Sequence, residues 1–238
     1  MRCTLILVTG ATGTVGTELV RQLVEAGETP RVLVRDPAKL GAIKAKVDVA
    51  VGDLGRPETL TPALCGVTKV FLLAFGANLP KYDANLIDAA KAAKVEHIVK
   101  LSVLTIDEEP PSAVTAWHLP GEEKLRTSGM AWTFLRPDVF MSNTLSWAPT
   151  IKEQGLFYHP TGQGKWAPID PFDIAAVGVA ALTKSGHASN AYTLTGPVTL
   201  SAGEHAEILT RVLGKPTALG YSPPRPPKGT VQAKAVNL

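Results

Sequence analysis

Short apolar runs alternate with amphipathic stretches along the first part of the chain. The runs predict buried strands, and the stretches between them predict helices. The expected strands are 5–8, 31–35, 47–53, 70–74, 97–103 and 132–136, and the expected helices are 18–26, 57–64, 82–93 and 121–128. Strands that alternate with helices favour parallel pairing. The pattern therefore predicts an α/β fold with a doubly wound parallel sheet and helices on both faces.

The alternation weakens after Pro137. Short strands are expected at 155–158, 165–169 and 191–194, and helices at 171–183 and 202–213. Ser201 and Glu204 have the spacing of a capping box, and Asp173 is a candidate helix cap. We expect a small C-terminal α/β subdomain. The predicted division is a core at 1–140, a subdomain at 141–220 interleaved with core elements, and an irregular Pro-rich tail at 221–238.

A glycine-rich turn follows the first apolar run, Leu5 to Val8, and leads into a helical pattern. Gly10 would allow the sharp turn, Gly13 would let a pyrophosphate approach the backbone, and Gly16 would let the helix pack closely. Free N–H groups at the helix start favour phosphates. The expected contacts of this Rossmann turn are Gly10, Thr12, Gly13, Thr14, Val15 and Gly16.

Arg35 ends the second predicted strand, where an acidic residue usually binds the ribose of NAD. A guanidinium there favours the 2′-phosphate of NADP, and Lys39 is near enough to add charge. Asp36 argues mildly for NAD, and a solvated Arg35 is the alternative.

Strand-end residues farther along are also candidate contacts, because ligands of such sheets bind at the carboxyl ends of the strands. A turn or cap role for Asp53 is as plausible as adenine contact. The candidates are Asp53 and Leu54 for adenine, and Ala74, Phe75 and Gly76 for adenosine and ribose.

Composition narrows the function classes. The chain has 238 residues and a formal net charge of +3, with its basic residues scattered, so nucleic acid is not an expected partner. Cys3 and Cys65 are expected in the core, and no metal-ligand spacing is present. No apolar run approaches a membrane span, and no targeting signal precedes the first strand. A cytoplasmic protein with a small-molecule substrate is expected.

Five segments together resemble the NmrA-like branch of the atypical short-chain dehydrogenase/reductases, over about residues 4 to 214. They are Val8 to Gly16, Val34 to Asp36, Ala89 to Val99, Trp132 to Pro137 and Asp170 to Ala175. The resemblance implies an NAD(P)-binding protein similar to quinone or azo-dye reductases, or to redox-sensing regulators of the same branch.

The wider superfamily uses a Tyr-x-x-x-Lys pair, in which the tyrosine donates a proton as hydride arrives. None of the four tyrosines here has a lysine four residues later. Alignment with the family places Val114 at the tyrosine position and His118 at the lysine position. His118 is the candidate proton donor, with contact to solvent or ribose alone as the alternative. Lys100 and Ser102 both belong to the predicted strand 97–103, and Ser102 is the preferred contact with the cofactor.

Aromatic and thioether side chains beyond the nicotinamide would suit a flat apolar acceptor, although any one of them could belong to the core. The candidates are Phe75, Trp117, Phe140, Met141 and Trp147. The favoured function is NADPH-dependent reduction of quinone-like or other conjugated molecules. The alternatives are a non-catalytic NAD(P) sensor that acts through a regulatory protein partner, and a biosynthetic isomerase or reductase that uses His118. A homodimer is also compatible with the sequence.

Overall fold

The computed structural model describes residues 4–220. Its contacts divide the chain into two compact units. Of the described residues, unit 1 contains 4–142 and 167–197, and unit 2 contains 143–166 and 198–220. The predicted tail at 221–238 lies outside the described residues.

Unit 1 is built on a seven-stranded sheet in the order β3-β2-β1-β4-β5-β6-β9, with every neighbouring pair parallel. The strands are β1 (Ile6–Val8), β2 (Arg31–Val34), β3 (Asp48–Val51), β4 (Lys69–Leu72), β5 (His97–Leu101), β6 (Ala131–Pro137) and β9 (Asn190–Leu194). The order reverses between β1 and β4, which creates the crevice where Rossmann folds bind dinucleotides. The predicted doubly wound fold is confirmed.

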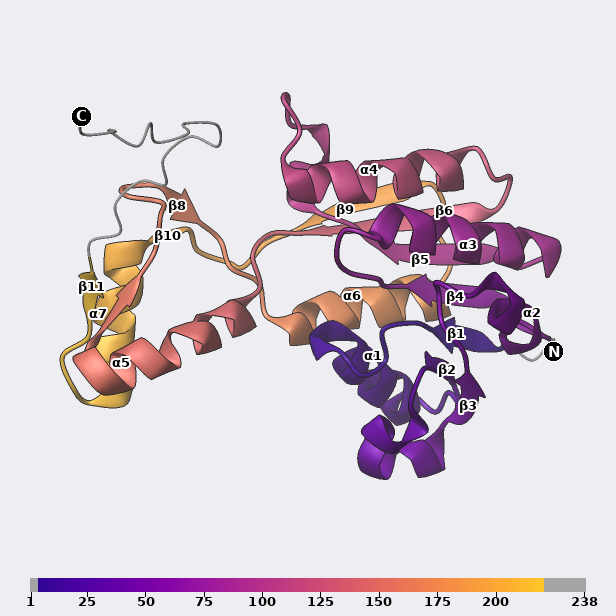
Figure 1. Ribbon diagram of the computed structural model, residues 1–238, viewed down its shortest axis with the longest axis horizontal. Helices are drawn as coiled ribbons and strands as arrows, with labels where there is room; N and C mark the ends of the chain where they lie inside the picture. The colour runs from indigo at the N-terminus through magenta and orange to yellow at the C-terminus, as the bar shows by residue number, and fades with distance from the viewer. Residues whose placement is uncertain (1–3, 221–238) are drawn as a thin grey trace, which may run out of the picture. The chain divides into compact units, whose positions relative to one another are not determined.

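Helices cover both faces of this sheet (Figure 1). α1 (Thr14–Glu25) and α6 (Pro171–Thr183) bury apolar residues in one hydrophobic cluster, whereas α2 (Leu60–Ala63), α3 (Leu79–Ala92) and α4 (Ala113–Arg126) contribute to the other. Successive side chains of β1 alternate between the clusters, since Ile6 and Val8 face one and Leu7 the other. The 3₁₀ segments that lie entirely in this unit are η1 (Pro37–Lys46), η2 (Pro57–Thr59) and η3 (Leu104–Asp107).

The range 141–220, predicted to hold a subdomain interleaved with core elements, contains α6 and β9. α6 packs against α1, and β9 pairs with β6 in parallel from Thr133↔Asn190 to Pro137↔Leu194. Both elements therefore belong to unit 1. The sequence shows a helix and a strand here but not their pairing partner, because β6 lies more than 50 residues earlier.

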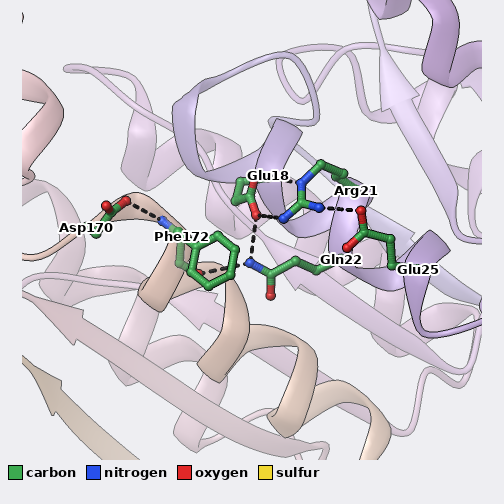
Figure 2. Close-up of polar contacts among 6 residues, drawn as sticks. All are labelled: Glu18, Arg21, Gln22, Glu25, Asp170 and Phe172. Carbon is green, nitrogen blue, oxygen red and sulfur yellow. Dashed lines mark hydrogen bonds and ion pairs between the residues drawn. The ribbon is translucent and has the colours of Figure 1, made fainter.

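Polar contacts join α1 to the start of α6 (Figure 2). Gln22 Nε2 donates to the Phe172 carbonyl at 3.0 Å, and the Arg21 guanidinium lies 5.7 Å from the centre of the Phe172 ring. The helix cap is Asp170, whose side chain accepts from the Phe172 N–H at 2.9 Å. The predicted cap, Asp173, is wrong, because it lies within the first turn instead of before it.

Two further expectations about unit 1 need correction. α4 is longer than the predicted helix at 121–128: it starts at Ala113, and the Ser112 side chain caps it by accepting from the Thr115 N–H. Pro120 lies inside it and removes one backbone donor without ending the helix.

Cys65 is exposed, so its predicted core position is wrong, and Cys3 lies outside the described residues.

Unit 2 has its own small core. Ile151, Phe157 and Ala206 are buried together, and Trp147 stacks on Phe157 with the ring centres 4.1 Å apart. Its elements are η4 (Met141–Trp147, shared with unit 1), α5 (Ala148–Gln154), β7 (Leu156–Tyr158), β8 (Lys165–Trp166), β10 (Leu200–Ser201), α7 (Ala202–Leu213) and β11 (Ala218–Gly220). β10 pairs antiparallel with β8, and β11 pairs parallel with β7. The predicted capping box at Ser201 and Glu204 is present.

Candidate cofactor and active site

The glycine-rich turn between β1 and α1 has three glycines with separate roles. Gly10 has a φ of +65°, which an L side chain rarely adopts. Gly13 is the N-cap of α1 and is exposed, so a ligand can approach its backbone. A Cβ at Gly16 would lie 2.1 Å from the Gly10 carbonyl oxygen. Gly16 therefore makes room for the backbone of the turn itself, whereas the sequence had suggested packing on the strand.

The first turn of α1 presents unpaired N–H groups and the positive end of the helix dipole. Thr12, Gly13 and Thr14 are exposed there, and the first turn contains no acidic residue that would repel an anion. Val15 is buried, so only its backbone faces this region. Thr9 fixes the neighbouring strand ends, because its hydroxyl donates to the Leu73 carbonyl at 2.9 Å and accepts from the Leu73 N–H at 2.8 Å.

A surface hollow lies where β2 and β3 end. It is lined by Arg35, Val51, Gly52, Asp53, Arg56 and Thr59. Two arginines thus line one hollow, and Arg56 forms an ion pair with Glu58, with 2.9 Å between Nε and Oε1. Asp36 is occupied as the cap of η1, since its carboxylate accepts from the Ala38 N–H at 2.9 Å. Lys39 is exposed and is not among the lining residues.

Asp53 shapes the turn after β3. Its Oδ1 accepts from the Gly55 N–H at 2.7 Å, and its backbone N–H donates to the Thr59 hydroxyl at 3.0 Å. The turn role considered from the sequence is therefore present, and Oδ2 makes no protein hydrogen bond in this turn. Asn85 Nδ2 donates to the Leu54 carbonyl at 2.7 Å and thereby ties this loop to α3.

The loop after β4 carries an exposed aromatic ring. Ala74 is half-buried, Gly76 has a φ of +96°, and the Phe75 side chain is 82% exposed. The Trp117 ring of α4 meets Phe75 edge-on, with the ring centres 6.2 Å apart. Two predicted site residues from distant parts of the sequence are thus brought together at the carboxyl ends of the strands.

Ser102 and His118 are both buried near this point. Ser102 follows β5, and neither its Oγ nor His118 Nδ1 has a hydrogen-bond partner. Burial and the positive charge of Lys100 lower the pKa of His118 to about 3, against a smaller opposite effect from its hydrogen bond to the Leu101 carbonyl. The imidazole is neutral at pH 7, so it does not supply a proton as an imidazolium.

The remaining predicted pocket residues are divided between the two units. Phe140 packs against the core of unit 1 and forms a β-bridge with Ile169, while Met141 is partly exposed. Trp147 stacks in the core of unit 2, which agrees with the structural alternative considered for it.

Sequence patterns do not single out three residues near the site: Arg56, Asp83 and Lys100. Arg56 follows a short loop after β3, and the sequence does not distinguish it from the other scattered basic residues. Asp83 and Lys100 form a buried ion pair, with 2.6 Å between Asp83 Oδ2 and Lys100 Nζ. A lysine inside an otherwise apolar strand was the available signal. Within residues 4–220, no helix is long and apolar enough to cross a bilayer, and no group of three or more acidic, His or Cys side chains is placed to hold a metal.

The turn, the helix start and the basic hollow fit a dinucleotide with phosphates. Residues 10–185 match a protein family described as NAD(P)H-binding. The chain belongs to this family. The NAD(P)H-binding chain is 45% identical to an NAD(P)H azoreductase from Xenophilus azovorans over 214 residues, which cover 89% of this chain and 75% of that protein.

Two further relatives agree with this membership. A (4-alkanoyl-5-oxo-2,5-dihydrofuran-3-yl)methyl phosphate reductase from Streptomyces griseus is 44% identical over 89% of this chain and 75% of its own length. The NADPH complex of the quinone oxidoreductase QOR2 from Escherichia coli has a TM-score of 0.85 and 32% identity, covering 92% of this chain and 78% of that one. The predicted family resemblance and the predicted class, an NAD(P)H-dependent oxidoreductase, are confirmed.

Proposed function

We propose that this NAD(P)H-binding protein reduces quinone-like or azo compounds, with NADPH as the hydride donor. The observation that carries the proposal is the edge-on Phe75–Trp117 pair at the carboxyl ends of the strands, with Phe75 82% exposed. Exposed aromatic rings suit a flat conjugated acceptor. The names of the azoreductase and quinone oxidoreductase relatives support the same substrate class.

The residues around this pair favour a reaction with little protein acid/base chemistry. Val114 stands at the position of the superfamily's tyrosine; its side chain is 40% exposed and has no ionisable proton to donate. His118 is neutral. Bound NADPH would supply a hydride, which is two electrons and one proton. A quinone that takes this hydride becomes a hydroquinone anion, and water can supply the second proton. The protein would then act mainly by holding donor and acceptor in register.

The first test is oxidation of NADPH by the purified full chain with a panel of quinones and an azo dye. Turnover that saturates with acceptor concentration is expected. Replacement of Phe75 by alanine should raise the KM for quinones several-fold, because the exposed ring no longer contacts the acceptor. Tight NADPH binding without turnover of any acceptor would contradict the proposal and favour the sensor alternative.

A preference for NADPH over NADH is the second part of the proposal. Arg35 and Arg56 line one hollow at the end of β2, where a 2′-phosphate would accept charge-assisted hydrogen bonds from guanidinium groups. Charge reversal in Arg35→Glu should weaken NADPH binding more than tenfold and NADH binding little. Arg56→Ala should cause a smaller loss of the same selectivity.

Isothermal titration with both cofactors measures this preference. Arg211→Glu, at an exposed arginine of α7 in unit 2, is the matched control for charge reversal and should bind both cofactors as the parent protein does. An equal loss of NADPH and NADH affinity in Arg35→Glu would overturn the assignment.

A further inference from the structure

The loop at 52–56 joins β3 to η2 and brings Arg56 to the hollow that Arg35 also lines. The Arg56 side chain is 69% exposed, and that of its ion-pair partner Glu58 is 63% exposed. Ion pairs between such exposed side chains contribute little, because water and salt screen them. The ion pair therefore fixes the Arg56 guanidinium only weakly, and the backbone of the loop determines where this side chain starts.

Both polar backbone groups of Arg56 have partners within this short segment. Its N–H donates to the Asp53 carbonyl at 2.9 Å. Its carbonyl accepts from the Thr59 backbone N–H at 3.0 Å and from the Thr59 hydroxyl at 2.7 Å. Pro57 follows and disfavours a helical conformation at Arg56. The backbone at Arg56 is consequently held from both sides.

The Thr59 hydroxyl closes the loop. It accepts from the Asp53 N–H at 3.0 Å while it donates to the Arg56 carbonyl. A hydroxyl has one proton to donate and can also accept, so these two bonds use both of its roles. A Cβ at Gly52 would lie 3.1 Å from Thr59 Oγ1, which places the hydroxyl directly against the end of β3. One side chain thus links the first and the last residues of the loop.

α3 holds the middle of the loop from outside. Asn85 Nδ2 donates to the Leu54 carbonyl at 2.7 Å. A Cβ at Gly55 would lie 3.2 Å from Tyr82 Cε1, so the tyrosine ring packs closely on the next residue of the loop. Tyr82 and Asn85 are one turn apart on α3 and share a face of this helix. The loop is therefore attached to a helix as well as to itself.

We propose that Thr59 and Asn85 are positioning residues for cofactor selectivity, which hold the loop at 52–56 so that Arg56 meets the 2′-phosphate of NADPH together with Arg35. Thr59 acts through the backbone of Arg56, and Asn85 acts through Leu54. This inference rests on the proposed preference for NADPH, because Arg56 contributes to selectivity only if the 2′-phosphate binds in the hollow.

The first test compares two substitutions of Thr59 by isothermal titration with NADPH and NADH. Thr59→Val keeps the shape of the side chain and removes the hydroxyl, so the ratio of NADPH to NADH affinity should fall by roughly threefold or more. Thr59→Ser keeps the hydroxyl and should restore the parent ratio. Thr127→Val is the matched control, because its hydroxyl bonds only carbonyls of α4, those of Glu123 and Lys124, and both affinities should stay unchanged.

A double-variant comparison shows whether Thr59 acts through Arg56. In the Arg56→Ala background, Thr59→Val should cause no further loss of selectivity, whereas independent effects would add. Additive losses would overturn the proposal. So would an unchanged affinity ratio in a folded Thr59→Val protein.

Glu58→Gln tests the rival explanation, in which the ion pair positions Arg56. The variant should not lower the preference for NADPH, and a fall as large as that in Thr59→Val would overturn the proposal. Asn85→Leu removes the contact with the Leu54 carbonyl and should lower the preference in the same direction as Thr59→Val. An unchanged preference in a folded Asn85→Leu protein would remove Asn85 from the proposal and overturn the role of α3.

Amide hydrogen exchange in the protein without cofactor tests the loop itself. The Asp53 N–H should exchange roughly tenfold faster in Thr59→Val than in the parent or Thr59→Ser, because its acceptor is lost. Unchanged exchange would overturn the inference whichever cofactor the protein prefers. Parent-like binding of both cofactors by Arg56→Ala would instead overturn the proposed role of Arg56 in the NADPH preference, and this inference with it. None of these measurements requires turnover, so a failure of the reductase activity is distinguishable from both.

Discussion

Gly16 is the residue at which the turn tolerates least change. A Cβ there would lie 2.1 Å from the Gly10 carbonyl oxygen and 3.1 Å from the Ala11 Cα, both of which are backbone atoms that cannot rotate away. Gly10 must in turn keep its φ of +65° beside Leu73. The phosphate-binding turn is therefore determined by backbone contacts between two glycines and not by side chains.

Gly16→Ala should weaken NADPH binding at least tenfold and lower the free energy of unfolding by about 1–3 kcal/mol, the usual cost of forced overpacking. Isothermal titration and urea unfolding measure the two effects. Gly203→Ala is the matched control, because Gly203 also lies in a helix and its added Cβ would meet nothing closer than 3.9 Å. A variant at Gly16 that binds NADPH as tightly as the control would refute the role of this contact.

At single positions, the sequence predicts best where the chemistry is local. The sharp turn at Gly10 and the capping box at Ser201 depend on residues a few positions apart, and both have the predicted geometry. His118 and Cys65 depend on what distant elements place around them. The lowered pKa of His118 results from burial and, to a smaller extent, from the charge of Lys100 on β5, and no pattern within α4 reveals either.

The start of α6 illustrates how one residue defines the end of an element. Asp170 precedes the helix and accepts the Phe172 N–H, while Phe172 also contacts α1 through Gln22 (Figure 2). The cap thus fixes the end of the helix that covers the sheet beside the cofactor turn. The sequence has aspartates at 170 and 173. Only the backbone conformation at the start of α6 shows that Asp170 is the N-cap.

Asp170→Ala should lower the free energy of unfolding by about 1 kcal/mol, because one N–H at the start of α6 loses its acceptor. Asp173→Ala should cost less, about 0.3–1 kcal/mol, through the helix dipole alone. Urea unfolding of both variants gives the comparison. An equal or larger loss in Asp173→Ala would show that the cap is assigned to the wrong residue.

Strong hydrophobic periodicity predicts the bounds of a helix or strand well, but it does not predict which other element that helix or strand packs against or pairs with. The ranges 171–183 and 202–213 agree with α6 and α7 at both ends. The helix expected at 121–128 covers only the second half of α4, which also contains Pro120; a proline inside a helix costs one hydrogen bond, and packing can offset it. The strand expected at 191–194 lies within β9, but the sequence does not show that it pairs with β6, since strand pairing is a long-range property.

Over the whole molecule, buried histidines should make stability depend on pH. Burial lowers the pKa of His97 to about 4, and the charges of Lys69 and His187 act in the same direction. The unfolded chain binds this proton near pH 6.5 and the folded chain only near pH 4. The stability contributed by the neutral ring is therefore fully present above pH 6.5 and is lost as the pH falls from about 6.5 to about 4.

The free energy of unfolding should consequently fall between pH 7 and pH 4.5, as measured by urea unfolding across this range. His97 Nε2 is hydrogen-bonded to the Thr133 hydroxyl at 2.9 Å, and a glutamine at this position can still reach that hydroxyl. In His97→Gln, the fall in the free energy of unfolding should be smaller by about 2 kcal/mol. Asp83, whose pKa burial raises, contributes with the opposite sign and cancels in the comparison of the two proteins. Identical slopes for the two proteins would contradict the assignment to His97.

The way in which the chain leaves and re-enters unit 1 has a consequence for protein engineering. The Phe140–Ile169 bridge, the Met141 N–H to Ile169 carbonyl bond of 2.8 Å and the Asp138 contact to the Ala167 N–H at 3.0 Å hold the exit and the return side by side. Residues 143–166 are consequently a cassette with closely spaced ends. A short glycine-containing linker could replace residues 143–166 without distorting β6 or α6. A truncation at residue 142, in contrast, would remove β9, the edge strand of the sheet. Chimaeras that exchange unit 2 among related reductases should therefore be cut at 142/167 and at 197, and not at a single point in the chain.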